Sequence, residues 1–181
     1  IALTFLFIFF MSHSEIYSHL TAIFIFLLAS LTDFYDGYLA KKYHWESDFG
    51  KIMDPIADKF LILVAFFIFL KLNMIQPWMF IAIFLREFII TSLRIFAMTR
   101  GKIMTAEKSG KLKTFFQVLT IVMMLIFFTF IKSHQLIESA VITHLGKSII
   151  YIFMLVTVFL TLGSGLLYLW SNRKFIFHAL S

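Results

Sequence analysis

Residues 31–60 read "LTDFYDGYLAKKYHWESDFGKIMDPIADKF" and hold four aspartates in a chain otherwise crowded with phenylalanine, isoleucine and leucine. The four are Asp33, Asp36, Asp54 and Asp58. An acidic side chain costs free energy inside an apolar helix, so its presence there usually indicates a function. A prediction of the fold and function must therefore account for four carboxylates that lie so close together in sequence.

The composition points to a membrane protein. Hydrophobic residues make up 61% of the chain and charged residues 14%, more apolar surface than a soluble core needs. The net charge of +6 would suit nucleic acid, but the basic residues lie in short clusters between apolar runs. That pattern is typical of loops beside anionic lipid, so we expect membrane lipid and no nucleic acid as partner. The chain has no cysteine, which excludes disulfides.

A helix that crosses a bilayer needs about 20 mostly apolar residues. We expect six such helices, the first truncated at its N-terminus, in an all-α polytopic membrane protein with one domain over residues 1–181. The predicted spans are 1–11, 16–40, 52–72, 77–99, 111–132 and 147–170. Pro77 fits the first turn of its helix, where its missing N–H is harmless.

The distribution of lysine and arginine predicts the orientation. Alternate breaks between the spans are rich in basic residues, namely Lys41, Lys42, Lys51, Arg100, Lys102, Lys108, Lys111, Lys113, Arg173 and Lys174. The other breaks hold only Lys71, Lys132 and Lys147. The positive-inside rule places the rich set in the cytoplasm. We therefore expect the aspartates in a polar cavity on the cytoplasmic side of the cytoplasmic membrane.

The aspartate spacing predicts a metal site. Asp33 and Asp36 are three residues apart and Asp54 and Asp58 four, so each pair shares a helical face. A loop of roughly ten residues between the helix ends favours antiparallel neighbours, which brings the pairs together. Four unpaired anions repel in a partly dehydrated site, and divalent cations relieve this. Oxygen ligands favour Mg²⁺ or Mn²⁺ over zinc, and four carboxylates can hold two ions, as in phosphoryl transfer.

Each aspartate taken alone also has a plain structural explanation. Asp54 before Pro55 would make an N-cap with proline at the first helical position. Asp36 before Gly37 is an ordinary turn signal. A lysine such as Lys59 would simply neutralise a neighbour. Capping and turns do not, however, require four carboxylates at these spacings.

The stretch resembles the signature of the CDP-alcohol phosphotransferases, D-x-x-D-G-x-x-A-R, eight or nine residues, then G-x-x-x-D-x-x-x-D. The matching residues are Asp33, Asp36, Gly37, Ala40, Gly50, Asp54 and Asp58. Lys41 stands where the family usually has arginine. Lysine keeps the charge but loses the bidentate grip on phosphate.

The resemblance implies six transmembrane helices and two divalent cations held by the four aspartates. It also implies a CDP-linked lipid, with Gly37, Ala40 and Gly50 leaving room for the nucleotide and Lys41 near its diphosphate. Asp58 would be the general base that takes the proton of the acceptor hydroxyl. CMP leaves, and the acceptor alcohol is joined to the lipid phosphate.

A second stretch points to the acceptor. Arg86 and Arg94 lie in an apolar helix on broadly one side, and Lys111 and Lys113 begin the next helix. Four cations converging beside a metal site favour an acceptor that carries a phosphate. The plain alternative is that Glu87 pairs with one of the arginines or with Lys59.

The wording "REFIITSLR" at 86–94, with "GKLKT" at 110–114 and Gln117, resembles one branch of that family, the bacterial phosphatidylglycerophosphate synthases. The resemblance implies CDP-diacylglycerol and sn-glycerol 3-phosphate as substrates and phosphatidylglycerophosphate and CMP as products. Glu87, Thr114 and Gln117 match the branch without an assignable role.

Two alternative functions stay open. A sister transferase would use another acceptor, such as inositol phosphate or phosphatidylglycerol. A divalent-cation transporter would instead carry its carboxylates near the bilayer midplane. The crowding of the aspartates at one expected membrane face counts against transport.

The remaining polar features say less about function. "GSG" at 163–165 would let helices pack closely, within one chain or in a homodimer. His13, His19, His134 and His144 show no metal-ligand spacing, and we expect them at the surface.

Overall fold

The chain was analysed as a computed structural model, which describes residues 2–13, 15–43, 48–100, 109–133 and 140–173. Within those ranges, the side chains at 33–43, 48–55, 57–58, 109–111 and 140–143 lie outside the description. The described backbone forms six α-helices and contains no strand. They are α1 (Ala2–Ser12), α2 (Ile16–Tyr43), α3 (Asp48–Lys71), α4 (Pro77–Thr99), α5 (Ser109–Ser133) and α6 (Ala140–Ser171).

Each of the six predicted spans becomes one helix, so the all-α fold is confirmed. The boundaries near the aspartates differ, because α2 continues to Tyr43 and α3 already begins at Asp48. A run of apolar residues predicts only the part of a helix that can lie in the hydrocarbon of a membrane, not the polar turns at its ends. Lysine and alanine are good helix formers, and a helix can continue through them past its apolar part. The connection between α2 and α3 is therefore shorter than the roughly ten residues expected.

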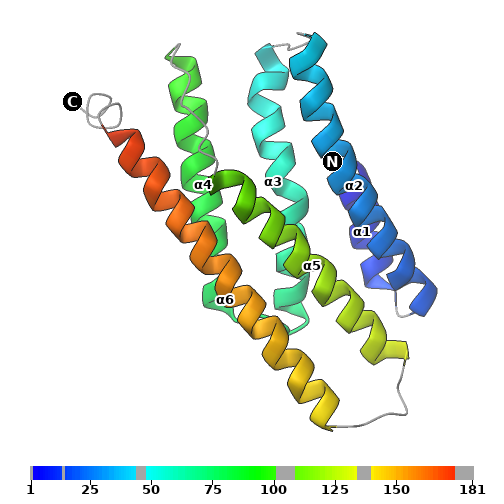
Figure 1. The fold of residues 1–181 in the computed structure, drawn as a ribbon. Helices are drawn as coiled ribbons and strands as arrows, with labels where there is room; N and C mark the ends of the chain where they lie inside the picture. The colour runs from blue at the N-terminus through cyan, green and yellow to red at the C-terminus, as the bar shows by residue number, and fades with distance from the viewer. Residues whose placement is uncertain (1, 14, 44–47, 101–108, 134–139, 174–181) are drawn as a thin grey trace.

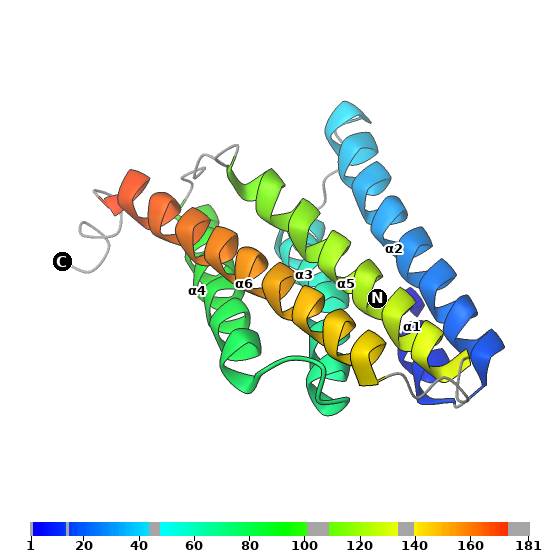
Figure 2. The same ribbon diagram turned by 60° about the horizontal axis from the view of Figure 1, so that its bottom comes forward.

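The helices run up and down in one bundle (Figures 1 and 2). α5 packs against α2, α3 and α6, while α4 packs against α3 and α6, and α1 against α2 and α3. The end of α2, the beginnings of α3 and α5, and the ends of α4 and α6 are the upper ends of these helices in Figure 1. The basic-rich breaks join or follow these ends, as the alternation along the sequence requires.

The outer surface of the bundle is apolar. Within the described residues, Leu112–Ser133 and His144–Ser171 are helices long and apolar enough to cross a membrane. Phe24, Phe88 and Phe159 expose 64%, 62% and 78% of their area, and many other large apolar side chains are exposed. Helices satisfy their backbone hydrogen bonds internally, so such a surface can face lipid at no cost in polar groups.

The α3–α4 connection is a tight, well-defined turn. Asn73 has a left-handed φ of 55°, its N–H bonds to Leu70 O at 3.0 Å, and Met74 N–H bonds to Phe69 O at 3.0 Å. This is the Schellman pattern that ends a helix, and asparagine tolerates the left-handed position better than most residues. Pro77 then occupies the first turn of α4, as predicted.

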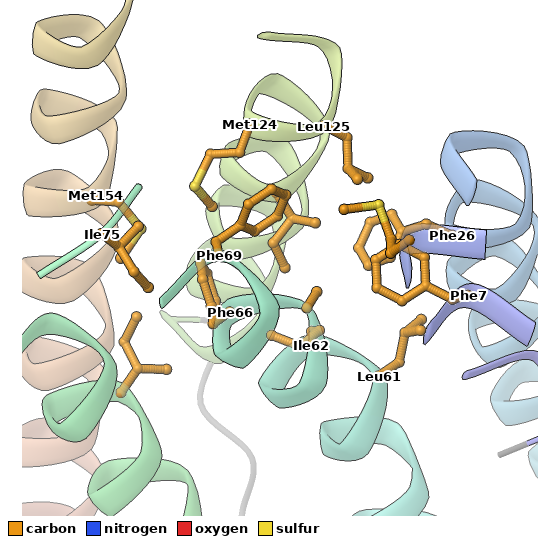
Figure 3. Packing of buried hydrophobic residues seen from close by; sticks show 14 of the residues in the cluster. Phe7, Phe26, Leu61, Ile62, Phe66, Phe69, Ile75, Met124, Leu125 and Met154 are labelled. Atoms are coloured by element: carbon orange, nitrogen blue, oxygen red, sulfur yellow. The ribbon is translucent and has the colours of Figure 1, made fainter. Parts of the chain in front are cut away.

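The buried core joins all six helices through large apolar side chains (Figure 3). Phe7 of α1 and Phe26 of α2 lie with ring centroids 5.6 Å apart. Phe66 and Phe69 of α3 are fully buried in the same cluster, together with Met124 of α5. Close packing of this kind is the main attraction between helices once lipid has replaced water around them.

The expectation that His19 lies at the surface is wrong. Its side chain is 1% exposed, and its ring meets Phe128 of α5 edge-on at 5.0 Å between centroids. Neither ring nitrogen has a hydrogen-bond partner among the described residues. The position near a polar break suggested exposure, but α5 packs over this turn of α2.

Replacing Phe66 by alanine should lower the thermal unfolding temperature in detergent, because a buried phenylalanine leaves a cavity worth about 3–5 kcal/mol. The matched control is Phe159→Ala, whose ring faces outward and should leave the unfolding temperature nearly unchanged. Equal shifts in the two variants would contradict the assignment of Phe66 to the core and of Phe159 to the outer surface.

Candidate functional site

The motif aspartates belong to two helices that pack against each other. Asp33 and Asp36 lie in the second half of α2, and Asp54 and Asp58 lie in the first half of α3. α2 and α3 are in contact, and the end of one meets the beginning of the other at the upper end of the bundle (Figure 1). The four side chains lie outside the described part of the structure, as do those at Gly37, Ala40, Lys41 and Gly50. The metal and nucleotide sites therefore remain predictions.

The helix boundaries remove two plain explanations for the motif. Asp54 cannot be an N-cap, because α3 begins six residues earlier at Asp48. Asp36 and Gly37 do not form a turn, because α2 continues through them to Tyr43. Glycine costs about 1 kcal/mol and proline about 3 kcal/mol in a helix interior. The motif therefore places unfavourable residues inside helices, which local stability does not explain.

A buried acidic side chain stands at the centre of a second polar group. Glu87 of α4 is 2% exposed and accepts three hydrogen bonds. Arg86 donates from Nη1 to Oε2 at 3.2 Å, and Gln117 donates from Nε2 to Oε1 at 3.2 Å. Lys113 of α5, 4% exposed, donates from Nζ to the same Oε1. Glu87 thus carries an ion pair to its own helix and another to α5.

The network continues onto α6. Arg86 donates from Nη2 to Ser164 Oγ at 3.1 Å, and Gln117 donates from Nε2 to Thr161 Oγ1 at 3.3 Å. In the described residues α4 and α5 do not approach closely along their backbones, whereas both pack on α6. Long polar side chains therefore connect α4 to α5 across the space between them.

The two predicted arginines lie on one side of α4. A charge interaction reaches from Arg94 to Arg86, and the Arg94 guanidinium lies 5.9 Å from the centre of the Tyr168 ring of α6. The side chain of Arg86 packs closely against α6 at Gly165, because a Cβ built on Gly165 would lie 2.9 Å from Arg86 Cγ. Its Nε is buried without a hydrogen-bond partner among the described residues.

The structure thus brings together three of the four predicted acceptor-binding residues. Arg86 and Lys113 share Glu87, and Arg94 lies near Arg86. The side chain of Lys111 lies outside the described part. Arg86 and Lys113 share one carboxylate, which leaves a net positive charge in a largely water-excluded place. Such a charge attracts an anion strongly.

The residues on the α6 side of this network were not among the predicted site residues. Thr157, Thr161, Ser164 and Tyr168 recur at intervals of four, three and four residues, and Lys113, Gln117 and Thr120 recur at four and three. Such a polar stripe on an apolar helix marks a face turned toward other helices. Thr120 and Thr157 confirm this with a hydroxyl–hydroxyl bond of 2.8 Å between α5 and α6.

The sequence profile of the CDP-alcohol phosphatidyltransferases matches residues 1–163 of the chain. The chain belongs to this family. A Rickettsia felis protein named CDP-diacylglycerol–glycerol-3-phosphate 3-phosphatidyltransferase is 33% identical over 157 residues, 83% of this chain and 78% of that protein.

Shorter alignments lead to proteins with related names. The Bacillus subtilis CDP-diacylglycerol–glycerol-3-phosphate 3-phosphatidyltransferase is 38% identical over 104 residues, 58% of this chain and 54% of that protein. A probable phosphatidylglycerophosphate synthase of Mycobacterium tuberculosis is 41% identical over 97 residues, 54% of this chain and 46% of that protein. In these alignments the chain spans about half the length of its relatives.

Proposed function

We propose that the chain transfers the phosphatidyl group of CDP-diacylglycerol to sn-glycerol 3-phosphate, giving phosphatidylglycerophosphate and CMP. The observation that carries the proposal is the cation group formed by Arg86, the buried Lys113 and the half-buried Arg94, on helices that pack against α3, which bears part of the family's aspartate motif. Membership of the family and the names of the relatives support the same reaction.

The aspartates have the chemistry needed to hold the divalent cations on which the family generally depends. Both pairs sit at same-face spacings within continuous helices, and carboxylate oxygens are the ligands that Mg²⁺ and Mn²⁺ prefer. Asp33, Asp36, Asp54 and Asp58 would hold two ions. When bound, the ions would neutralise the diphosphate and stabilise charge on the leaving group.

The chain's own residues then have distinct tasks in the transfer. Asp58 accepts the proton of the acceptor hydroxyl, whose oxygen forms a bond to the phosphorus of the lipid phosphate. The bond from that phosphorus to the bridging oxygen breaks, and CMP carries the electron pair away. Gly37, Ala40 and Gly50 leave room for the nucleotide, and Lys41 contacts its diphosphate as a point charge.

The acceptor's phosphate would bind Arg86, Arg94, Lys111 and Lys113. These cations gain little from inositol, which has no charge, or from serine, whose carboxylate is balanced by its own ammonium group. Inositol phosphate and phosphatidylglycerol also carry a phosphate, so a sister reaction is the second candidate. Six transmembrane helices, a cytoplasmic active site and a homodimer complete the proposal.

Purified protein with Mg²⁺ or Mn²⁺ and CDP-diacylglycerol should release CMP at least about tenfold faster with glycerol 3-phosphate than with glycerol, because cations that bind a phosphate reject the analogue lacking it. Glycerol is the matched control, since it differs only in that phosphate. A panel of serine, inositol, inositol phosphate and phosphatidylglycerol identifies the alternative acceptors. Equal or faster CMP release with any of them would overturn the acceptor assignment.

Asp58→Asn should lower kcat by about 10²-fold or more, the usual contribution of a general base. CDP-diacylglycerol binding should largely survive, because asparagine keeps the shape of the side chain. Asp48→Asn, at the first position of the same helix and outside the motif, is the control and should keep normal turnover. Chelating the metal should abolish CMP release, and Mg²⁺ or Mn²⁺ should restore it; full activity of the Asp58 variant would exclude this base.

A further inference from the structure

Glu87 is placed between two cations that come from different helices. Arg86 bonds to one carboxylate oxygen, and Lys113 bonds to the other. With only 2% of the glutamate exposed, water contributes little to its solvation. Charges in such a place are stable only when they are paired and hydrogen-bonded.

The carboxylate keeps the two cations from repelling one another. Without it, Arg86 and Lys113 would face each other across the same low-dielectric space, where like charges repel strongly. Gln117 helps to fix the carboxylate by donating to Oε1. The three charged groups together carry a net charge of +1, so the pairing does not abolish their attraction for a phosphate.

Arg86 is also fixed from the side of α6. Ser164 accepts from Nη2, and the absence of a side chain at Gly165 leaves space for the arginine stem. A methyl group there would lie 2.9 Å from Cγ and 3.1 Å from Nε, closer than such contacts normally occur. Nη1 and Nη2 are thus both engaged, while Nε is buried and without a partner among the described residues.

We propose that Glu87 is a positioning residue for the acceptor's phosphate: it holds Arg86 and Lys113 together so that both face one phosphate group, and Gly165 provides the clearance this arrangement needs. The proposal rests on the proposed function, since it requires an acceptor that carries a phosphate. It assigns a task to Glu87 and Gly165, which touch the cations and not the reacting atoms.

Three variants test this proposal by the KM of each substrate. Glu87→Gln keeps the size of the side chain but removes its charge. It also replaces one acceptor oxygen by an amide NH₂ group, which cannot accept a hydrogen bond from Arg86 or Lys113. Gly165→Ala adds one methyl group against Arg86. Gly163→Ala is the matched control, because nothing lies within 4 Å of a Cβ built there.

Glu87→Gln and Gly165→Ala should raise the KM for glycerol 3-phosphate about tenfold, since each misplaces charge-assisted contacts to the phosphate. The KM for CDP-diacylglycerol should stay within about twofold, because its site lies on the α2–α3 motif. Gly163→Ala should resemble the wild type in both constants. An unchanged KM for glycerol 3-phosphate, or an equal rise in both KM values, would overturn the proposal.

A binding measurement covers the case in which Glu87→Gln folds but turns over too slowly. Glycerol 3-phosphate should raise the thermal unfolding temperature of the wild type and of Gly163→Ala. It should raise that of the two test variants much less; an equal rise would contradict the proposal. If Glu87→Gln does not fold, Gly165→Ala decides the question alone, since it leaves every charge in place.

The outcome also separates this inference from the proposed function. If the wild type releases no more CMP with glycerol 3-phosphate than with glycerol, the proposed function fails. If the wild type prefers glycerol 3-phosphate and both test variants keep its KM, the reaction stands and only the positioning role fails.

Discussion

The buried carboxylate of Glu87 is the interaction on which the arrangement of α4, α5 and α6 depends. It pairs with Arg86 on its own helix and with Lys113 on α5. Arg86 also donates to Ser164 of α6, and Gln117 of α5 donates both to Glu87 and to Thr161 of α6. Removing one partner of a buried ion pair costs about 3–5 kcal/mol, because the other charge is left uncompensated. The ion pairs of Glu87, with the hydrogen bonds of their partners, thus help to fix α4, α5 and α6 relative to one another.

This organisation follows from the surroundings of the chain. The exterior is covered by side chains such as Phe88 and Phe159, which suit lipid. Apolar contacts alone give little preference for one helix partner over another in lipid, so polar bonds between helices add specificity. The same polar groups that fix α4, α5 and α6 also leave a net positive charge beside the aspartate motif. On the proposed function, one set of residues would serve both assembly and binding.

Much of the fold could be predicted from the sequence, because apolar length determines which segments form spanning helices. The start of α3 at Asp48 could not, since an aspartate followed by a proline, as at Asp54, is an equally good start signal. Arg86 and Lys113 were predicted to converge. That Glu87 is their shared partner depends on its contact with Lys113, which lies 26 residues away in sequence and on another helix. His19 was misjudged for the same reason, because burial by Phe128 is a tertiary effect.

A double-mutant cycle on unfolding stability tests the central role of Glu87 most directly. Glu87→Gln, Lys113→Met and the double variant would be unfolded in detergent, and their free energies of unfolding compared with that of the wild type. The pairing predicts that each single variant is destabilised and that the double variant loses clearly less than the sum, since neither Glu87 nor Lys113 is then left facing the loss of the other. Arg86 loses Glu87 in the single Glu87 variant and in the double variant alike, so its contribution cancels in the cycle. Strictly additive losses would contradict the account.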